Sequence, residues 1–314
     1  MPFTPRRLVI AWFVAMILVS PVAVAEHFWV ALADEGDPYA EVAAVLQQEL
    51  GGAMNVRVGH WQALLEEKTA PPDLLVTVGI SALDGLLERL PKMGDGWSHV
   101  PVLATLIPRV VFDARQASPT LGRRPFSAVV LDQPLGRLLA LIKRALPDRP
   151  RVGILPGQQV SAQIDALKKE AGLHQLKLVV GPFIGASKDI SPSLKPTLEE
   201  SDVILALPEP IVYNAASLQY ILLTSYRAHI PLVAYSAAAV KSGAVLALYS
   251  TPDQMARRAI EMIQTWQVKH KLPLPQFARE FRVGRNTRVA ASLGLVIDDP
   301  TVIEKELQRL EGDQ

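Results

Sequence analysis

Cysteine is absent from all 314 residues of the chain. Its absence excludes disulfide bonds, zinc–thiolate sites, iron–sulfur clusters and cysteine nucleophiles. It also excludes a lipid-anchored export signal, which needs a cysteine at its cleavage point. The folded chain must therefore be stabilised by its core alone. A chain of this length with 49% hydrophobic and 20% charged residues can form such a core, and its size is typical of two domains.

The sequence also lacks the motifs of common enzymes. It has no G-x-G-x-x-G after its first expected strand, no G-x-x-x-x-G-K-[ST] phosphate loop and no G-x-S-x-G serine elbow. Its histidines are isolated and form no i, i+4 pair for a metal, so we expect them on the surface or at helix caps. They are His27, His60, His99, His174, His229 and His270. The sequence therefore predicts no catalytic residue, no metal site and no cofactor.

A concentrated basic charge is missing as well. The formal net charge is +1, with 32 basic and 31 acidic residues spread along the chain. Binding to nucleic acid or to an anionic membrane surface requires a clustered basic face. We therefore expect neither kind of partner.

The N-terminus has the pattern of a cleavable signal peptide. Arg6 and Arg7 precede the apolar run 8–20, Pro21 ends that run, and residues 23–25 read Ala-Val-Ala. A positive start, an apolar middle and a small-x-small end are typical of secretory signals, and cleavage is predicted after Ala25. The alternative is an uncleaved membrane anchor, although the run is short for a segment that must span a bilayer. The prediction is a periplasmic protein.

From residue 27 onward, short apolar runs alternate with amphipathic runs of helical spacing. Continuous apolar strands between helices are typical of parallel sheets covered on both faces. The alternation runs once to about residue 132 and begins again after it. The sequence therefore predicts an α/β fold of two doubly wound parallel-sheet lobes joined by a hinge of several strands.

The division of the chain between the lobes follows from the order of these runs. We expect residues 26–132 and about 237–271 in the N-terminal lobe, with strand 245–248 and helix 252–268 returning there. Residues 133–236 and about 276–314 are expected in the C-terminal lobe. A basic, proline-containing linker, 269–275, precedes the last return. The chain would cross between the lobes three times, and each crossing is a hinge candidate.

Candidate ligand-binding residues lie in the loops that follow the expected strands. Ligands of doubly wound sheets bind beyond the carboxyl ends of the strands, where helix N-termini offer free N–H groups. The candidates are Tyr39, Gly79, Ser81, Arg109, Asp132, Gln133, Gln158, Glu209, Tyr213, Asn214, Tyr235 and Ser236.

Several of these residues have a structural alternative. Ser81 and Asn214 could cap helices, and the three tyrosines could be ordinary partly buried aromatics. Arg109 could bind a ligand carboxylate or lie on the surface. Glu209 stands between two prolines, which hold its carboxylate at the end of a strand. It could pair with a ligand ammonium group or with Arg109 across the cleft.

The stretch around Pro208 to Pro252, LPEPIVYNAASLQYILLTSYRAHIPLVAYSAAAVKSGAVLALYSTPDQ, resembles the substrate-binding proteins of ABC transporters. Within that family it is similar to tryptophan- and tyrosine-binding proteins. Supporting pieces are DQPLGRLLALIKRALPDRPRVGIL, VTVGISALDGLL and RNTRVAASLGL. The resemblance covers essentially the whole chain after residue 25 and implies the type I periplasmic binding fold. It also implies a monomer that binds a small molecule.

The chain departs from the amino-acid-binding members at three positions. Those members have a Gly-Thr turn where this chain has Gly79-Ile80-Ser81. They commonly have an aspartate where this chain has Glu209, and an acidic residue where Ala237 stands. The resemblance therefore implies a divergent branch whose ligand can differ from an amino acid.

Three hypotheses follow. The first is a periplasmic solute-binding protein that binds a small molecule, amino-acid-like or other, between its lobes and presents it to an ABC permease in the inner membrane. The second is a sensory or accessory protein that signals to a membrane receptor or transporter. The third, an enzyme on the same scaffold, has no visible nucleophile–base pair behind it. We expect the first.

Overall fold

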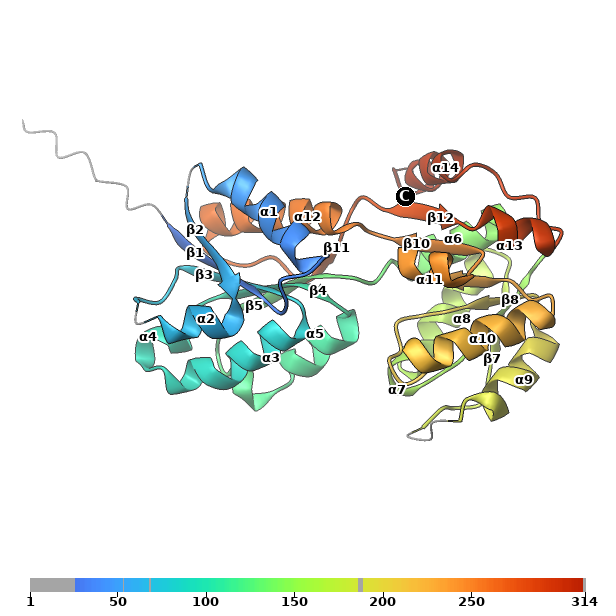
Figure 1. Cartoon of the computed structure of the whole chain (residues 1–314), viewed down its shortest axis with the longest axis horizontal. Helices are drawn as coiled ribbons and strands as arrows, with labels where there is room; N and C mark the ends of the chain where they lie inside the picture. The colour runs from blue at the N-terminus through green and yellow to red at the C-terminus, as the bar shows by residue number, and fades with distance from the viewer. Residues whose placement is uncertain (1–25, 53, 68, 186–188, 313–314) are drawn as a thin grey trace, which may run out of the picture.

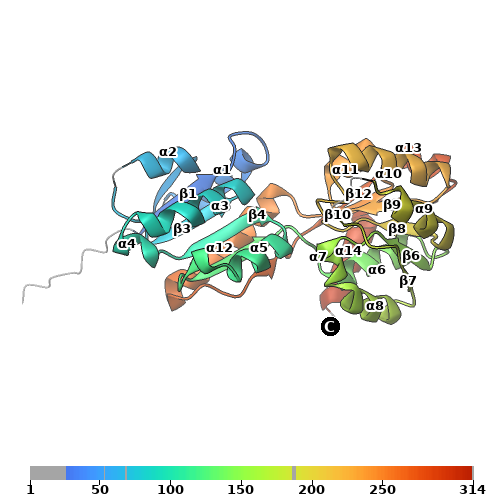
Figure 2. The same cartoon turned by 90° about the horizontal axis from the view of Figure 1, so that it is seen from below.

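A computed structural model describes residues 26–52, 54–67, 69–185 and 189–312. The expected signal segment, residues 1–25, lies outside the described residues. The chain forms two lobes side by side, joined by extended segments (Figures 1 and 2). Within the described part, no helix is long and apolar enough to cross a bilayer.

The N-terminal lobe is a six-stranded sheet in the order β11-β5-β4-β3-β1-β2, and every pairing in it is parallel. Its strands are β1 (His27–Leu32), β2 (Asn55–His60), β3 (Leu74–Val78), β4 (Val102–Ile107), β5 (Phe126–Val130) and β11 (Gln276–Phe277). Its helices are α1 (Tyr39–Leu50), α2 (Trp61–Glu66), α3 (Ile80–Arg89), α4 (Asp95–Ser98), α5 (Arg109–Gln116) and α12 (Pro252–Lys269).

The C-terminal lobe repeats this plan in the order β12-β10-β9-β8-β6-β7, with β12 antiparallel to β10. Its strands are β6 (Arg151–Ile154), β7 (Lys177–Val180), β8 (Val203–Leu205), β9 (Leu232–Ala234), β10 (Leu246–Tyr249) and β12 (Arg282–Arg285). Its helices are α6 (Leu135–Ala145), α7 (Gln158–Ser161), α8 (Ile164–Leu173), α9 (Ser191–Glu200), α10 (Ala215–Arg227), α11 (Ala237–Ser242), α13 (Thr287–Ser292) and α14 (Pro300–Gly312).

Each sheet is buried on both faces. In β3, Leu74, Val76 and Val78 face α1 and α12, whereas Leu75 contributes to the cluster with α3 and α4 on the other face. The C-terminal sheet likewise separates two apolar clusters. Burial on both faces explains why the strands are continuous apolar runs. The predicted fold class, two doubly wound lobes, is confirmed.

The structure corrects the expected path between the lobes in two places. Residues 237–249, expected in the N-terminal lobe, form α11 and β10 of the C-terminal lobe, because Leu246 pairs with Val233 of β9 and with Arg285 of β12. The chain returns only at Ser250. Residues 276–277, expected in the C-terminal lobe, form β11 beside β5 of the N-terminal lobe. The three crossing segments are therefore 131–134, 250–251 and 278–281.

Candidate functional site

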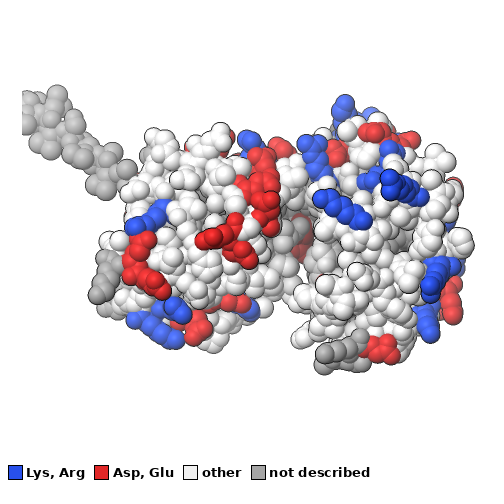
Figure 3. All heavy atoms as spheres, in the orientation of Figure 1, with Lys and Arg blue, Asp and Glu red and all other residues white. Residues whose placement is uncertain are grey.

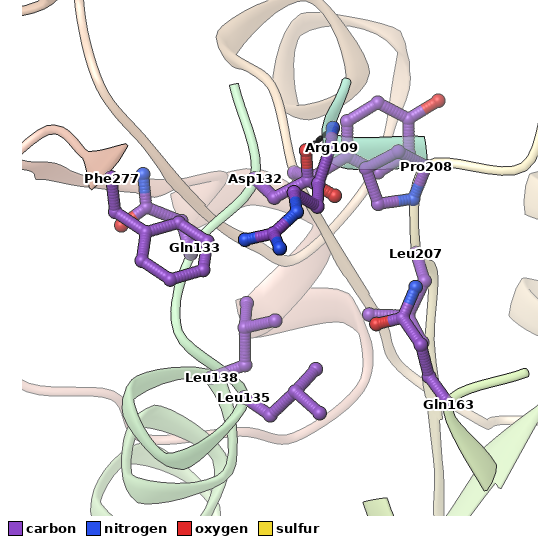
Figure 4. Close-up of a pocket in the computed structure, with 10 residues that line it drawn as sticks. Arg109, Asp132, Gln133, Leu135, Leu138, Gln163, Leu207, Pro208 and Phe277 are labelled. Atoms are coloured by element: carbon purple, nitrogen blue, oxygen red, sulfur yellow. Dashed lines mark hydrogen bonds between the residues drawn. The ribbon is translucent and has the colours of Figure 1, made fainter. Parts of the chain in front are cut away.

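The two lobes face each other with the carboxyl ends of their strands, and a hollow lies between them. The hollow measures about 520 Å³ when its opening to solvent is included, and the centre of a water-sized molecule can occupy about 60 Å³ of it. It is lined from both lobes and from the crossing segments, as Figure 4 shows. The lining residues are Arg109, Asp132, Gln133, Leu135, Leu138, Gln163, Leu207, Pro208, Tyr235 and Phe277.

Arg109 is the charged group that the N-terminal lobe contributes. It is the first residue of α5, and its guanidinium points toward the middle of the lining residues (Figure 4). Its backbone N–H donates to Asp132 Oδ2 at 2.5 Å, and its Nε donates to Asp113 Oδ1 at 2.9 Å. These bonds hold the side chain at the hollow while 41% of it stays exposed. It is therefore placed to bind a carboxylate as a fork.

Asp132 lies in the first crossing segment and accepts a hydrogen bond from the first backbone N–H group of α5. Burial raises the pKa of its carboxyl group, although the hydrogen bond from the Arg109 N–H acts in the opposite direction. One carboxylate oxygen is thus committed to the fold. Asp132 lies at the hollow, and part of its role there is to position Arg109.

Gln133 also lines the hollow, but both ends of its amide are used inside the protein. Its Nε2 donates to Ser250 Oγ at 2.9 Å, and its Oε1 accepts a 2.7 Å bond from Arg137 Nη1. The side chain is buried. Its contacts link a second crossing segment and α6, so the structure makes it a hinge residue rather than a free ligand contact.

Tyr235 forms the aromatic wall on the C-terminal lobe, at the end of β9. Its ring meets Tyr213 edge-on at 6.4 Å between centroids. Burial raises the pKa of the Tyr235 hydroxyl, which keeps it protonated and able to donate a hydrogen bond at neutral pH. Tyr213 itself is buried behind this wall and does not line the hollow.

Glu209 does not bridge the cleft. It is buried, and its Oε2 accepts hydrogen bonds from the backbone N–H groups of Gln159 and Val160 at 2.8 and 3.0 Å. A Cβ on Gly157 would lie 2.4 Å from the Glu209 carboxyl carbon, so a glycine is needed there. Of the two partners suggested for Glu209, a ligand ammonium group and Arg109, the second is therefore wrong, because the carboxylate is turned into its own lobe and holds the β6–α7 loop.

Two other candidates in the C-terminal lobe are helix caps. Asn214 Oδ1 accepts from Ala216 and Ser217 N–H at 3.1 Å each and forms a capping box on α10. Ser236 Oγ accepts from Ala239 N–H at 3.2 Å on α11. The structural alternative therefore applies to Asn214, and the same role falls to Ser236. Gln158 is an exposed first residue of α7 outside the hollow.

Three N-terminal candidates form a small cluster beyond the hollow's lining. Gly79 has φ +96°, and an added Cβ would lie 2.6 Å from the Tyr39 ring. Its N–H donates to Thr105 O, so it is not free for a ligand. Ser81 caps nothing, because α3 begins at Ile80 and has no side-chain cap. Within the described part of the chain, the first N–H groups of α3 therefore have no side-chain cap.

Six lining residues were not among the sequence-predicted candidates: Leu135, Leu138, Gln163, Leu207, Pro208 and Phe277. Leu135 and Leu138 stand one helical turn apart just after Gln133, a spacing from which they could have been found. Phe277 belongs to a two-residue strand far along the chain, and no local signal marks it. Among the described residues, no group of three His, Cys, Asp or Glu could hold a metal ion.

Comparison with known proteins agrees with this architecture. Residues 131–267 match the model of a family described as ABC transporter substrate binding protein. No curated protein matches the chain.

Several solved structures share the fold. A conserved domain protein from Vibrio cholerae has 18% identity and a TM-score of 0.57, covering 89% of this chain and 98% of its own. The ABC domain in complex with L-Trp from Streptococcus pneumonia has 15% identity and a TM-score of 0.58, covering 88% and 98%. A ligand-free, open substrate-binding protein with adhesive properties from Clostridium difficile has 15% identity and a TM-score of 0.64, covering 87% and 96%.

Two parallel-dominated six-stranded lobes with this topology define the class of type I periplasmic binding folds. Residues 131–267 match the family model of ABC transporter substrate-binding proteins, and the solved structures share the fold of the whole chain. The resemblance that the sequence indicated is confirmed.

Proposed function

We propose that the chain is the substrate-binding component of an ABC import system, which binds a small molecule between its lobes and releases it to a permease in the inner membrane. The observation that carries the proposal is the hollow, to which both lobes contribute side chains at the carboxyl ends of their strands. The matched family and its structural neighbours are binding proteins, and the proposal gives the chain no catalytic role.

The lining supports a ligand with one anionic and one apolar part. Arg109 offers a guanidinium whose Nε is already fixed by Asp113, and Leu135, Leu207 and Phe277 offer apolar surface. Asp132 adds a carboxylate on the same side as Arg109. We therefore infer a small, amino-acid-like molecule, with its carboxylate on Arg109 and its apolar part against Tyr235.

The proposal also requires the lobes to move. The space that the centre of a water-sized molecule can occupy in the hollow, about 60 Å³, is smaller than a typical ligand site of about 300–1,000 Å³. A ligand that touches both walls would favour a closed arrangement, because it binds that state better than the open one. Such hinge closure would present a distinct surface to the permease.

The location follows from the sequence rather than from the fold. We propose that residues 1–25 direct export and are removed, so that the mature chain begins at Glu26 and works in the periplasm. Mass spectrometry of the protein recovered from a periplasmic extract tests this. A mature mass beginning at Glu26 is expected, and an intact Met1 in the membrane fraction would contradict it.

A thermal-shift screen of residues 26–314 against amino acids, short peptides, nucleobases, sugars and the small-molecule fraction of a cell extract tests the binding function. A ligand at one hundred times its dissociation constant adds about 2.7 kcal/mol of stability. That should raise Tm by a few degrees. We expect such a shift in the wild type, and its loss in Arg109→Ala and Tyr235→Ala.

Two matched variants control for general damage. Arg115→Ala removes another arginine of α5, which pairs with Asp84 away from the hollow. Tyr226→Ala removes an exposed tyrosine of α10. Both should retain the shift. If all four variants keep it, the ligand binds elsewhere; if no fraction shifts the wild type, the import function is contradicted in favour of a partner-protein role.

A further inference from the structure

The three crossing segments are tied together by a chain of hydrogen bonds. Gln133 of the first segment donates to Ser250 Oγ of the second at 2.9 Å. Ser250 Oγ in turn donates to the backbone oxygen of Glu280 in the third at 2.8 Å. One side chain from each of two segments thus fixes the spacing of all three at the narrow waist between the lobes (Figure 2).

Arg137 holds this chain from within the C-terminal lobe. It lies on the first turns of α6, is only 7% exposed, and donates from Nη1 to Gln133 Oε1 at 2.7 Å. Its guanidinium lies over the ring of Phe281, with Cζ 4.2 Å from the ring centroid. Arg137 therefore contacts both the first and the third crossing segment.

The counter-charge comes from the last helix of the chain. Glu311 near the end of α14 accepts from Arg137 Nε at 2.5 Å and from Nη2 at 2.8 Å, a fork-to-fork pair. The end of α14 lies close to the crossing segments, where C marks the terminus in Figure 1. Arg137 is buried and Glu311 is 37% exposed at its side chain, so the pair is reached from one side only.

We propose that Glu311 and Arg137 form a strap by which the C-terminal helix sets the resting separation of the two lobes. Hinge motion changes the backbone dihedrals of the crossing segments. Such a change moves Gln133 and Phe281 relative to Arg137 and strains a buried, charge-assisted network. Without Glu311, the guanidinium loses its fixed orientation, and the crossing segments sample a wider range of angles.

The same two helices provide a matched control. Arg144 of α6 pairs with Glu306 of α14, seven residues along α6 from Arg137. Glu306→Gln therefore weakens the contact between α6 and α14 by a similar change of one carboxylate to an amide. Within the described part of the chain Glu306 contacts no crossing segment, whereas Glu311 acts on these segments through Arg137.

The experiment measures the distance between the lobes in the protein without ligand. Because the chain has no cysteine, Gln48→Cys on α1 and Gln219→Cys on α10 give one exposed labelling site in each lobe without background. Spin labels on these residues report the distribution of lobe separations by electron–electron double resonance. Wild type and Glu306→Gln should give one narrow distribution, and Glu311→Gln a broader or shifted one.

Arg137→Met extends the test, because it keeps an unbranched side chain beside Phe281 and removes the charge. It should broaden the distribution at least as much as Glu311→Gln; if it does not fold, Glu311→Gln alone decides. The strap is contradicted if Glu311→Gln matches the wild type, and equally if Glu306→Gln broadens the distribution as much. The role of the strap in hinge closure rests on the proposed function. The distance measurement uses no ligand, so its outcome is independent of the outcome of the ligand screen.

Discussion

The two lobes have the same strand order, yet they satisfy the helix N-termini around the cleft in different ways. In the C-terminal lobe Glu209 holds α7, Asn214 caps α10 and Ser236 caps α11. Among the described residues of the N-terminal lobe, α1 and α3 have no side-chain cap, whereas the N-terminus of α5 is met by the carboxylate of Asp132.

This difference gives the lobes different tasks. The loops of the C-terminal lobe are fixed by their own hydrogen bonds before any ligand arrives, which leaves Tyr235 and Pro208 as a rigid wall. The N-terminal lobe keeps free N–H groups at α3 and a partly exposed guanidinium at Arg109. Its cleft face is therefore better suited to the anionic part of a ligand.

The charges of the lobes also differ. On the face shown in Figure 3, acidic side chains gather on the N-terminal lobe toward its neighbour, while Lys and Arg predominate on the facing part of the C-terminal lobe. Opposite charges on two hinged bodies favour their approach, and salt screens this attraction beyond about 8–10 Å. The strap at the hinge, not this weak attraction, would set the resting angle.

The largest effect should come from removing the anchor of the C-terminal loops. Glu209→Ala leaves the N–H groups of Gln159 and Val160 without their acceptor, at a cost of about 1–3 kcal/mol each. Urea unfolding measures the loss. Glu209→Gln keeps an acceptor and should recover most of the stability; an equal loss in both variants would show that the charge, not the loop contact, matters.

In the N-terminal lobe the corresponding weak point is a glycine. Gly79→Ala places a Cβ 2.6 Å from Tyr39 at a positive φ and should cost about 1–3 kcal/mol. Gly172→Ala in α8 has nothing within 4 Å of its new Cβ and should be neutral or stabilise by up to about 1 kcal/mol. Thermal unfolding of both variants checks this, and similar losses would refute the close approach of Tyr39.

The caps provide a direct contrast between the lobes. Asn214→Ala and Ser236→Ala should each destabilise by about 1 kcal/mol, because each removes an N-cap. Ser81→Ala should leave the free energy of unfolding nearly unchanged, since Ser81 caps no helix. Chemical denaturation of the three variants measures this, and a loss at Ser81 equal to that at Asn214 would contradict the contrast.

The smallest expected effect on stability concerns Asp132, whose carboxylate accepts a hydrogen bond from the N-terminus of α5. Burial raises the pKa of Asp132, so its contribution to stability is fully present in acid and is lost as pH rises through the folded pKa. Asp132→Asn keeps an acceptor for Arg109 N–H without that penalty. Urea unfolding between about pH 4 and pH 7 should show that the free energy of unfolding of the variant increases relative to that of the wild type as pH rises. A constant difference would contradict the raised pKa.

The fold was largely predictable because each sheet is buried on both faces, and strands buried in this way are continuous apolar runs in the sequence. The sequence pattern did not predict correctly to which lobe the short strands belong. Strand 246–249 is as apolar as any strand of either lobe, and its partners, Val233 and Arg285, are set by the three-dimensional path alone.

The site was predictable in part, for a related reason. Arg109, Asp132 and Tyr235 follow strands, and the rule that ligands bind beyond strand ends finds them at the hollow. The prolines beside Glu209 indicate a fixed carboxylate, but it accepts from the N–H groups of Gln159 and Val160, about fifty residues earlier in the chain. Phe277 reaches the hollow from β11, a two-residue strand that no local pattern predicts.

The most direct test of the account is the affinity of one ligand, found in the thermal-shift screen, for three proteins: the wild type, Arg109→Ala from the N-terminal lobe and Tyr235→Ala from the C-terminal lobe. Isothermal titration calorimetry gives the three dissociation constants. If one molecule is held by both lobes, each variant should bind at least about tenfold more weakly, a loss of about 1.4 kcal/mol. If either variant binds as tightly as the wild type, the ligand is not held between the lobes and the central claim fails.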